Sequence, residues 1–205
     1  MEKSILVSNY SLILIGGSAG SLEVIMQVLP ELPKQMQATV VIILHRKNDD
    51  SLLTKLLVGK TSLPVFEAED KSTILPGTVY VAPADYHLLV EKNKTFSLDY
   101  SEKINYSRPS IDVTFETAAE AYGNQLAAFL LSGANSDGAE GLSEVKKAGG
   151  LSVAQDAIEA LVEFMPASAI RMGAVNKIMK LEEMKQWFAS LPVNDHQTFL
   201  GQESP

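Results

Sequence analysis

A run of small residues near the amino terminus constrains the fold more than any other segment. Residues 12–15, Leu-Ile-Leu-Ile, lead directly into Gly-Gly-Ser-Ala-Gly-Ser at 16–21, and apolar side chains then resume at helical spacing over 21–29. We interpret this pattern as a buried strand, a tight turn and a helix. Such a turn can cradle a phosphate, or it can hold the hydroxyl of Ser18 out for attack.

The spacing of the glycines separates these two uses. A P-loop requires a lysine just after its last glycine, and a dinucleotide site requires G-x-G-x-x-G; neither pattern is present at this turn. Residues 16–20 do match G-x-S-x-G, the nucleophile elbow of α/β-hydrolases. That fold orders its triad Ser, Asp, His, whereas here His45 comes early and Asp137 late. We therefore expect a similar turn in a different fold.

Short apolar runs alternate with helical patterns along the chain. The predicted strands are 12–15, 39–44, 78–83, 126–131 and 151–155. The predicted helices are 21–29, 51–60, 110–123, 139–150, 166–173 and 181–191, and residues 87–100 are predicted to form a hairpin. Strands that alternate with helices imply right-handed crossovers. The sequence therefore predicts an α/β fold: a three-layer, doubly wound, mostly parallel sheet with helices on both faces and an antiparallel hairpin at one edge.

The composition excludes several kinds of site and partner. The 205 residues are 46% hydrophobic, enough for a buried core, and they include no cysteine, which excludes a thiol nucleophile, disulfides and cysteine metal sites. The formal net charge of -8 argues against binding nucleic acid through its phosphates. No apolar run is long enough to span a membrane and we recognise no signal peptide, so we expect a cytoplasmic protein without membrane insertion.

Three polar residues follow three different predicted strands. Ser18 follows 12–15, His45 follows 39–44, and Asp137 lies in the loop after 126–131. The carboxyl ends of parallel strands meet at one edge, where a serine needs a base and the base needs an anion. Each residue also has a structural interpretation: Ser18 as a helix cap or phosphate ligand, His45 as a structural histidine and Asp137 as an N-cap. His87 remains a second candidate base.

With these residues in place, the chain resembles the catalytic domain of the CheB protein-glutamate methylesterases. The resemblance covers roughly residues 11–185 and is carried by six segments in order. They are IGGSAGS (15–21), VIILH (41–45), LPGTVYVAPADYHLLV (75–90), SRPSIDVTFETAA (107–119), LLSGANSDGAEGL (130–142) and AQDAIEALVEFMPASAI (154–170). We expect a methylesterase catalytic domain over 1–191 and a polar tail over 192–205.

The resemblance implies a role for each site residue. Ser18 is expected to be the nucleophile, His45 the base and Asp137 the group that orients it. The resemblance suggests the backbone amide of Ala134 as one oxyanion donor, and the amide of Ala19, directly after the nucleophile, is the expected second donor. The implied substrate is a glutamyl methyl ester on the cytoplasmic helices of a methyl-accepting chemoreceptor, with glutamine deamidation as a related reaction. No metal or organic cofactor is implied.

Arg108, in the fourth segment, is assigned to substrate binding. The chain departs from the usual family pattern at Ala19, Ser21 and Ala167. These changes keep two alternatives open: a non-catalytic binding or regulatory module with the same fold, and an esterase for another substrate. The chain begins about ten residues before the first predicted strand. We therefore expect no phosphorylated receiver domain, and we expect either constitutive access to the site or gating by a separate regulatory partner.

Overall fold

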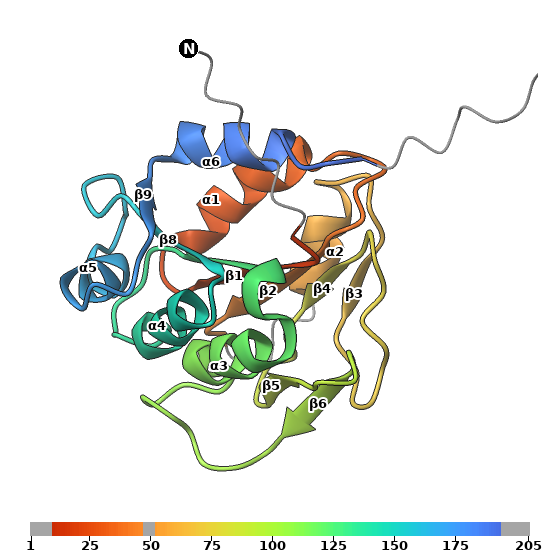
Figure 1. Cartoon of the computed structure of the whole chain (residues 1–205), viewed down its shortest axis with the longest axis horizontal. Helices are drawn as coiled ribbons and strands as arrows, with labels where there is room; N and C mark the ends of the chain where they lie inside the picture. The colour runs from red at the N-terminus through yellow and green to blue at the C-terminus, as the bar shows by residue number, and fades with distance from the viewer. Residues whose placement is uncertain (1–9, 47–51, 194–205) are drawn as a thin grey trace, which may run out of the picture.

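The computed structural model describes residues 10–46 and 52–193 (Figure 1). The strands are β1 (Leu12–Gly17), β2 (Thr39–Leu44), β3 (Val65–Glu67), β4 (Val79–Val81), β5 (His87–Val90), β6 (Phe96–Asp99), β7 (Leu126–Leu130), β8 (Leu151–Gln155) and β9 (Lys177–Met179). The α-helices are α1 (Ser21–Val28), α2 (Leu52–Val58), α3 (Ile111–Tyr122), α4 (Ala139–Lys147), α5 (Phe164–Arg171) and α6 (Leu181–Ala189). Two short 3₁₀ helices are η1 (Leu29–Glu31) and η2 (Gly123–Gln125).

Seven strands form one parallel sheet in the order β3-β4-β2-β1-β7-β8-β9. The first strand, β1, lies between β2 and β7. Strands β2 to β4 therefore extend the sheet on one side of β1, and β7 to β9 extend it on the other side. Every residue of β1 and β2 is buried, which fits strands covered on both faces. The predicted doubly wound parallel sheet is confirmed, and its reversal of strand order lies beside β1, where ligands of such sheets bind.

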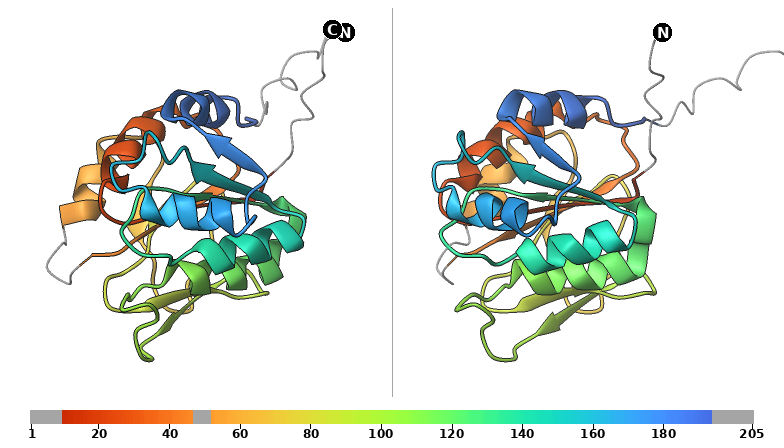
Figure 2. Two further views of the ribbon diagram at one scale, coloured as in Figure 1. Left: turned by 90° about the vertical axis from the view of Figure 1, so that its left-hand side faces the viewer. Right: turned by 60° about the vertical axis from the view of Figure 1, so that its left-hand side comes forward.

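Helices cover both faces of the sheet (Figure 2). One apolar core joins the sheet to α1, α2 and α6, and Ile25, Leu57 and Phe188 are fully or almost fully buried within it. A second core joins the opposite face to α3, α4 and α5, with Phe115 and Leu142 among its buried residues. Each core removes a continuous apolar surface from water, which is the main force that holds the three layers together.

The predicted hairpin forms as an antiparallel pair of β5 and β6, but it lies in a different place from the one expected. It makes a sheet of its own and packs beside α3, since Leu88 and Phe96 are buried in the same core as Phe115. The edge next to β4 is occupied instead by β3, to which the sequence analysis assigned no strand. Only one of the three side chains of β3 is buried, so it has too short an apolar pattern to be recognised.

The remaining differences concern the ends of elements. The helix predicted at 166–173 begins earlier, at Phe164, so that Pro166 lies in the first turn, where its missing N–H is not needed. The segment 174–179, given no element in advance, contributes the edge strand β9. Within residues 10–46 and 52–193, no helix is long and apolar enough to cross a bilayer. Most of the predicted tail lies outside the described residues.

Candidate active site

The ends of β1 and β2 bring two of the predicted residues next to each other. The last residues of these strands, Gly17 and Leu44, are paired in register, so Ser18 and His45 follow them side by side at the carboxyl edge of the sheet. The backbone N–H of His45 donates to the carbonyl oxygen of Gly17 at 3.2 Å. A nucleophile and a base candidate are thus anchored to the most deeply buried part of the sheet, which limits their movement.

Asp137 lies beneath His45 and forms the anionic end of the site. Its Oδ2 is 2.7 Å from His45 Nε2, and its side chain is fully buried. Three more donors come from the start of α3: the backbone N–H groups of Ile111 (2.8 Å) and Asp112 (3.1 Å) and the hydroxyl of Ser110 (2.9 Å). Asp137 therefore binds the positive end of α3 as well as the imidazole.

These contacts determine the charge of Asp137. Burial by itself raises the pKa of the Asp137 carboxyl, but the hydrogen bonds from His45 and from the backbone of Ile111 and Asp112 outweigh burial and lower the pKa below its usual value. Asp137 is consequently ionised at neutral pH. A neutral His45 therefore carries its proton on Nε2, facing Asp137, and leaves the lone pair of Nδ1 free to accept a proton.

The contact expected between Ser18 and His45 is not made in this state. Among the described residues, the Ser18 hydroxyl has no hydrogen-bond partner, although Ser18 is half-buried and follows β1 beside the end of β2, where His45 lies. His45 Nδ1 is instead 3.2 Å from the hydroxyl of Ser107. The structure therefore joins His45 to Asp137 and places Ser18 next to them, while the role of each residue stays a prediction.

The turn that carries Ser18 is fastened to the loop after β7 by Ser132. The Ser132 hydroxyl donates to the carbonyl of Ala19 at 2.7 Å and accepts from the backbone N–H of Val162 at 2.9 Å. The N–H of Ser18 donates to the carbonyl of Ser132 at 2.9 Å. The side chain of Gln155 accepts from the N–H of Ser132 at 3.0 Å. One fully buried serine thus holds three loops of the site together.

The two amides predicted as the oxyanion site lie on these fastened loops. Within the described chain, the backbone N–H groups of Ala19 and Ala134 donate to no acceptor, and both residues are exposed to solvent. Donors that are rigidly held and unused are what an oxyanion site requires, because they need no reorganisation when charge develops.

Gly20 allows the nucleophile turn to close tightly. Its φ of +83° lies in the left-handed region, and a Cβ at this position would be 2.6 Å from Leu161 Cβ and 2.9 Å from Ser132 Oγ. We expect Gly20→Ala to lower the unfolding free energy by about 1–3 kcal/mol and to displace Ser18. Gly59→Ala, where a Cβ meets nothing within 4 Å, is the matched control in thermal denaturation. Equal melting temperatures for the two variants would contradict this expectation.

Arg108, predicted to bind substrate, is engaged within the chain. Its guanidinium donates to Asp85 Oδ1 at 2.7 and 3.2 Å and to the carbonyls of Tyr100 and Ser101 at 3.1 and 2.6 Å. It also stacks over the ring of Tyr100, with 3.9 Å to the centroid. Through these contacts Arg108 stabilises the loop before α3. A role of Arg108 in substrate binding stays a prediction.

His87, the second candidate base, is part of the support of the site. It is 1% exposed, its Nδ1 accepts from the backbone N–H of Ser110 at 3.1 Å, and its Nε2 therefore carries the proton and donates to the carbonyl of Glu102 at 3.0 Å. Both ring nitrogens are used by the backbone, so His87 is not placed to accept a proton from Ser18. His196 lies outside the described residues.

Asp112 was not singled out from the sequence, yet it lies directly behind Asp137. Burial raises the pKa of Asp112 to about 7; the negative charge of Asp137 adds to this rise, while the backbone N–H of Gly141 opposes it. Asp112 Oδ1 accepts from that N–H at 2.8 Å. Two buried carboxyls in contact cannot both ionise easily, so Asp112 is the one that tends to hold a proton while Asp137 stays charged.

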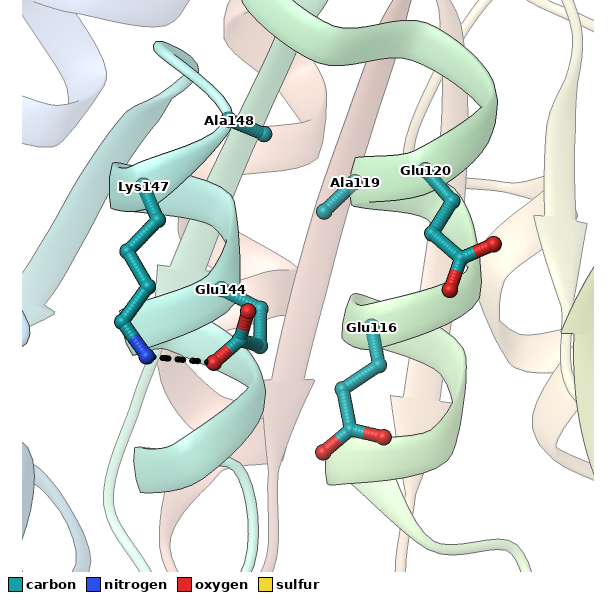
Figure 3. Close-up of a pocket in the computed structure, with 6 residues that line it drawn as sticks. All are labelled: Glu116, Ala119, Glu120, Glu144, Lys147 and Ala148. Carbon is teal, nitrogen blue, oxygen red and sulfur yellow. Dashed lines mark hydrogen bonds and ion pairs between the residues drawn. The ribbon is translucent and has the colours of Figure 1, made fainter.

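Away from this site, a cavity of about 540 Å³ lies between α3 and α4 (Figure 3). Burial, followed by the charges of neighbouring glutamates, raises the pKa of Glu116. The ion pair of Lys147 and Glu144 at 2.6 Å closes one side. The lining residues are Glu116, Ala119, Glu120, Glu144, Lys147 and Ala148. Among the described residues, no hydrogen bond or ion pair joins a lining residue to Ser18, His45 or Asp137, although the charge of Asp137 makes the smallest contribution to the raised pKa of Glu116.

Known proteins with similar sequences are named protein-glutamate methylesterases. A relative from Leptospira interrogans, which carries the combined name protein-glutamate methylesterase/protein-glutamine glutaminase in provisional form, is 45% identical over 188 residues, covering 91% of this chain and 97% of its own. Protein-glutamate methylesterase FrzG of Myxococcus xanthus is 34% identical, covering 87% of this chain and 55% of its own length. The chain thus spans nearly all of the first relative and about half of the second.

A solved structure and a family profile agree with these relatives. The crystal structure of the Thermotoga maritima CheB methylesterase catalytic domain superimposes with a TM-score of 0.84 at 34% identity, covering 89% of this chain and 99% of the other. The profile of the CheB methylesterases matches residues 13–188, which include all three strand ends described above. The chain therefore belongs to the CheB methylesterase family.

Proposed function

We propose that this chain hydrolyses glutamyl methyl esters on a methyl-accepting chemoreceptor-type protein, with Ser18 as nucleophile, His45 as base and Asp137 as the anion that orients the base. The observation that carries the proposal is the 2.7 Å contact between His45 Nε2 and the buried Asp137, formed beside Ser18 at the strand ends. Family membership supports the substrate class, because the relatives are named for this reaction.

The protonation of the imidazole determines which nitrogen does the chemistry. Asp137 accepts a hydrogen bond from Nε2–H, so Nδ1 is the nitrogen that takes the proton from Ser18. The Ser18 Oγ then attacks the γ-carbonyl carbon of the ester. The imidazolium that forms is stabilised by Asp137, which remains ionised throughout. Attack requires the Ser18 hydroxyl to form a hydrogen bond with Nδ1, a contact that Ser107 makes in the substrate-free state.

The later steps use the same groups. The amides of Ala19 and Ala134 hold the oxyanion of the tetrahedral intermediate, and Nδ1–H gives its proton to the departing methoxide, so that methanol leaves and a glutamyl ester of Ser18 remains. Water, deprotonated by His45, then releases the glutamate and restores Ser18. With a glutamine side chain as substrate, ammonia would leave by the same steps, as the combined name of the Leptospira relative suggests.

Release of methanol from a methylated chemoreceptor tests this function. Ser18→Ala should lower the rate by roughly 10³-fold or more, since the covalent step is lost. Ser11→Ala is the matched control, because Ser11 is an exposed serine directly before the amino end of the same strand, β1. A serine-reactive phosphonate should label the wild type but not the Ser18→Ala variant. Methanol release at an equal rate by both variants would contradict the proposed nucleophile.

A further inference from the structure

The hydroxyl of Ser107 is hydrogen-bonded to His45 Nδ1, the nitrogen that accepts the proton of Ser18 in the proposed mechanism. Ser107 Oγ lies 3.2 Å from His45 Nδ1, and Nε2 is already bound to Asp137. Because neutral His45 offers one lone pair, on Nδ1, the Ser107 hydroxyl is the donor in this contact. Ser18 and Ser107 therefore compete for the same acceptor, and in this state Ser107 holds it.

The placement of Ser107 is built by neighbouring groups. The side-chain amide of Asn135 donates to Ser107 Oγ and to the carbonyl of Asn105, both at 3.3 Å. The other end of the same side chain accepts from the backbone N–H of Asp137 at 3.3 Å. Asn135 thus links the segment that carries Ser107 to the loop that carries the anion, so the contact with His45 belongs to a connected polar network.

The backbone around Ser107 closes a tight turn. Ile104 and Ser107 exchange backbone hydrogen bonds at 2.8 and 3.2 Å, and the two residues between them, Asn105 and Tyr106, have φ values of +50° and +62°. Positive φ at two successive residues is typical of a two-residue hairpin turn, but it is unfavourable for tyrosine. Tyr106 is 97% exposed, so packing does not compensate. The turn is therefore held by its two backbone hydrogen bonds and by the side-chain contacts of Ser107 and Asn135.

We propose that Ser107 is a positioning residue that binds His45 Nδ1 in the substrate-free enzyme and yields it to Ser18 when substrate enters. This inference rests on the proposed function. Once His45 is protonated, Nδ1–H can donate to Ser107 Oγ while the Ser107 hydroxyl turns toward the carbonyl of Asn105, 3.4 Å away. Ser107 keeps its proton in both states, so it adds no step of proton transfer to the reaction. Only the hydrogen-bond partner of Nδ1 changes.

The rate at which a serine-reactive phosphonate labels Ser18 measures this competition in the full chain. Removing one competing hydrogen bond to Nδ1 should raise the labelling rate of Ser107→Ala by about threefold to tenfold. Ser107→Thr keeps the hydroxyl and should label at the wild-type rate. Ser101→Ala is the control on the same loop, because within residues 10–46 and 52–193 the Ser101 hydroxyl bonds only to Asp99, and it should also behave as wild type.

The outcomes separate this inference from the proposed function. Faster labelling of Ser107→Ala with restoration by Ser107→Thr supports it, since loosened packing alone would not be repaired by a hydroxyl. Unchanged or slower labelling of Ser107→Ala, with Ser18 still labelled, overturns the role of Ser107 and leaves Ser18 as nucleophile. Failure to label Ser18 in the wild type contradicts the proposed function itself.

Discussion

Replacing His45 by glutamine should lower kcat/KM for ester hydrolysis by roughly 10³-fold or more, while the protein stays folded. Glutamine has no nitrogen that can accept a proton at neutral pH, so the base is lost. Its side-chain amide can still donate a hydrogen bond to Asp137, and the three donors from α3 remain, so the buried carboxylate keeps its partners. Ester hydrolysis and thermal denaturation, measured side by side, check both halves of the expectation.

His87→Gln provides the matched comparison within the same site. Because His87 is buried and both of its nitrogens bind the backbone, this change should lower the melting temperature, and the protein that remains folded should keep most of its activity. His45→Gln should show the opposite pattern. If the His87 variant were folded but inactive and the His45 variant active, the base would be His87 and the assignment made here would be wrong.

Most of the fold could be predicted because its central strands are short runs of mainly apolar residues. The 39–44 and 151–155 predictions coincide with β2 and β8, and both strands are almost wholly buried. The edge strands β3 and β9 were missed because each has three residues, of which one is buried. Their pairing depends on a neighbour in the sheet and leaves too little periodicity in the chain itself.

The sequence could predict which residues of the site follow the ends of strands, but it could not predict the contacts that these residues make. A parallel sheet brings its carboxyl ends to one edge, so Ser18 and His45 could be placed together from the sequence. The sequence could not show which nitrogen of His45 faces Asp137, because that depends on how α3 presents its amino end. It could not reveal Ser107 either, since its position depends on the positive φ angles of Asn105 and Tyr106.

Asp112 should make the free energy of unfolding depend on pH, and the substitution Asp112→Asn should remove that dependence. Since burial first, and then the charge of Asp137, raise the pKa of Asp112 from 3.8 to about 7, the folded state binds a proton that the unfolded state has already lost over this range. The contribution of Asp112 to the unfolding free energy is therefore greatest below about pH 4, falls as the pH rises, and is constant above about pH 7. The difference between the two pKa values corresponds to about 4 kcal/mol.

Asp112→Asn keeps the shape of the side chain and removes its titration. The asparagine oxygen can still accept from the N–H of Gly141, and its amide can donate to Asp137 at every pH. Relative to the wild type, the variant should gain a few kcal/mol of unfolding free energy between pH 4 and pH 8, measured by urea denaturation. Glu140→Gln, at an exposed acid on α4, should show no such gain. A constant difference between wild type and Asp112→Asn across this range would mean that Asp112 is ionised in the folded protein, and that the amino end of α3 and the amide of Gly141 stabilise two adjacent buried charges rather than one.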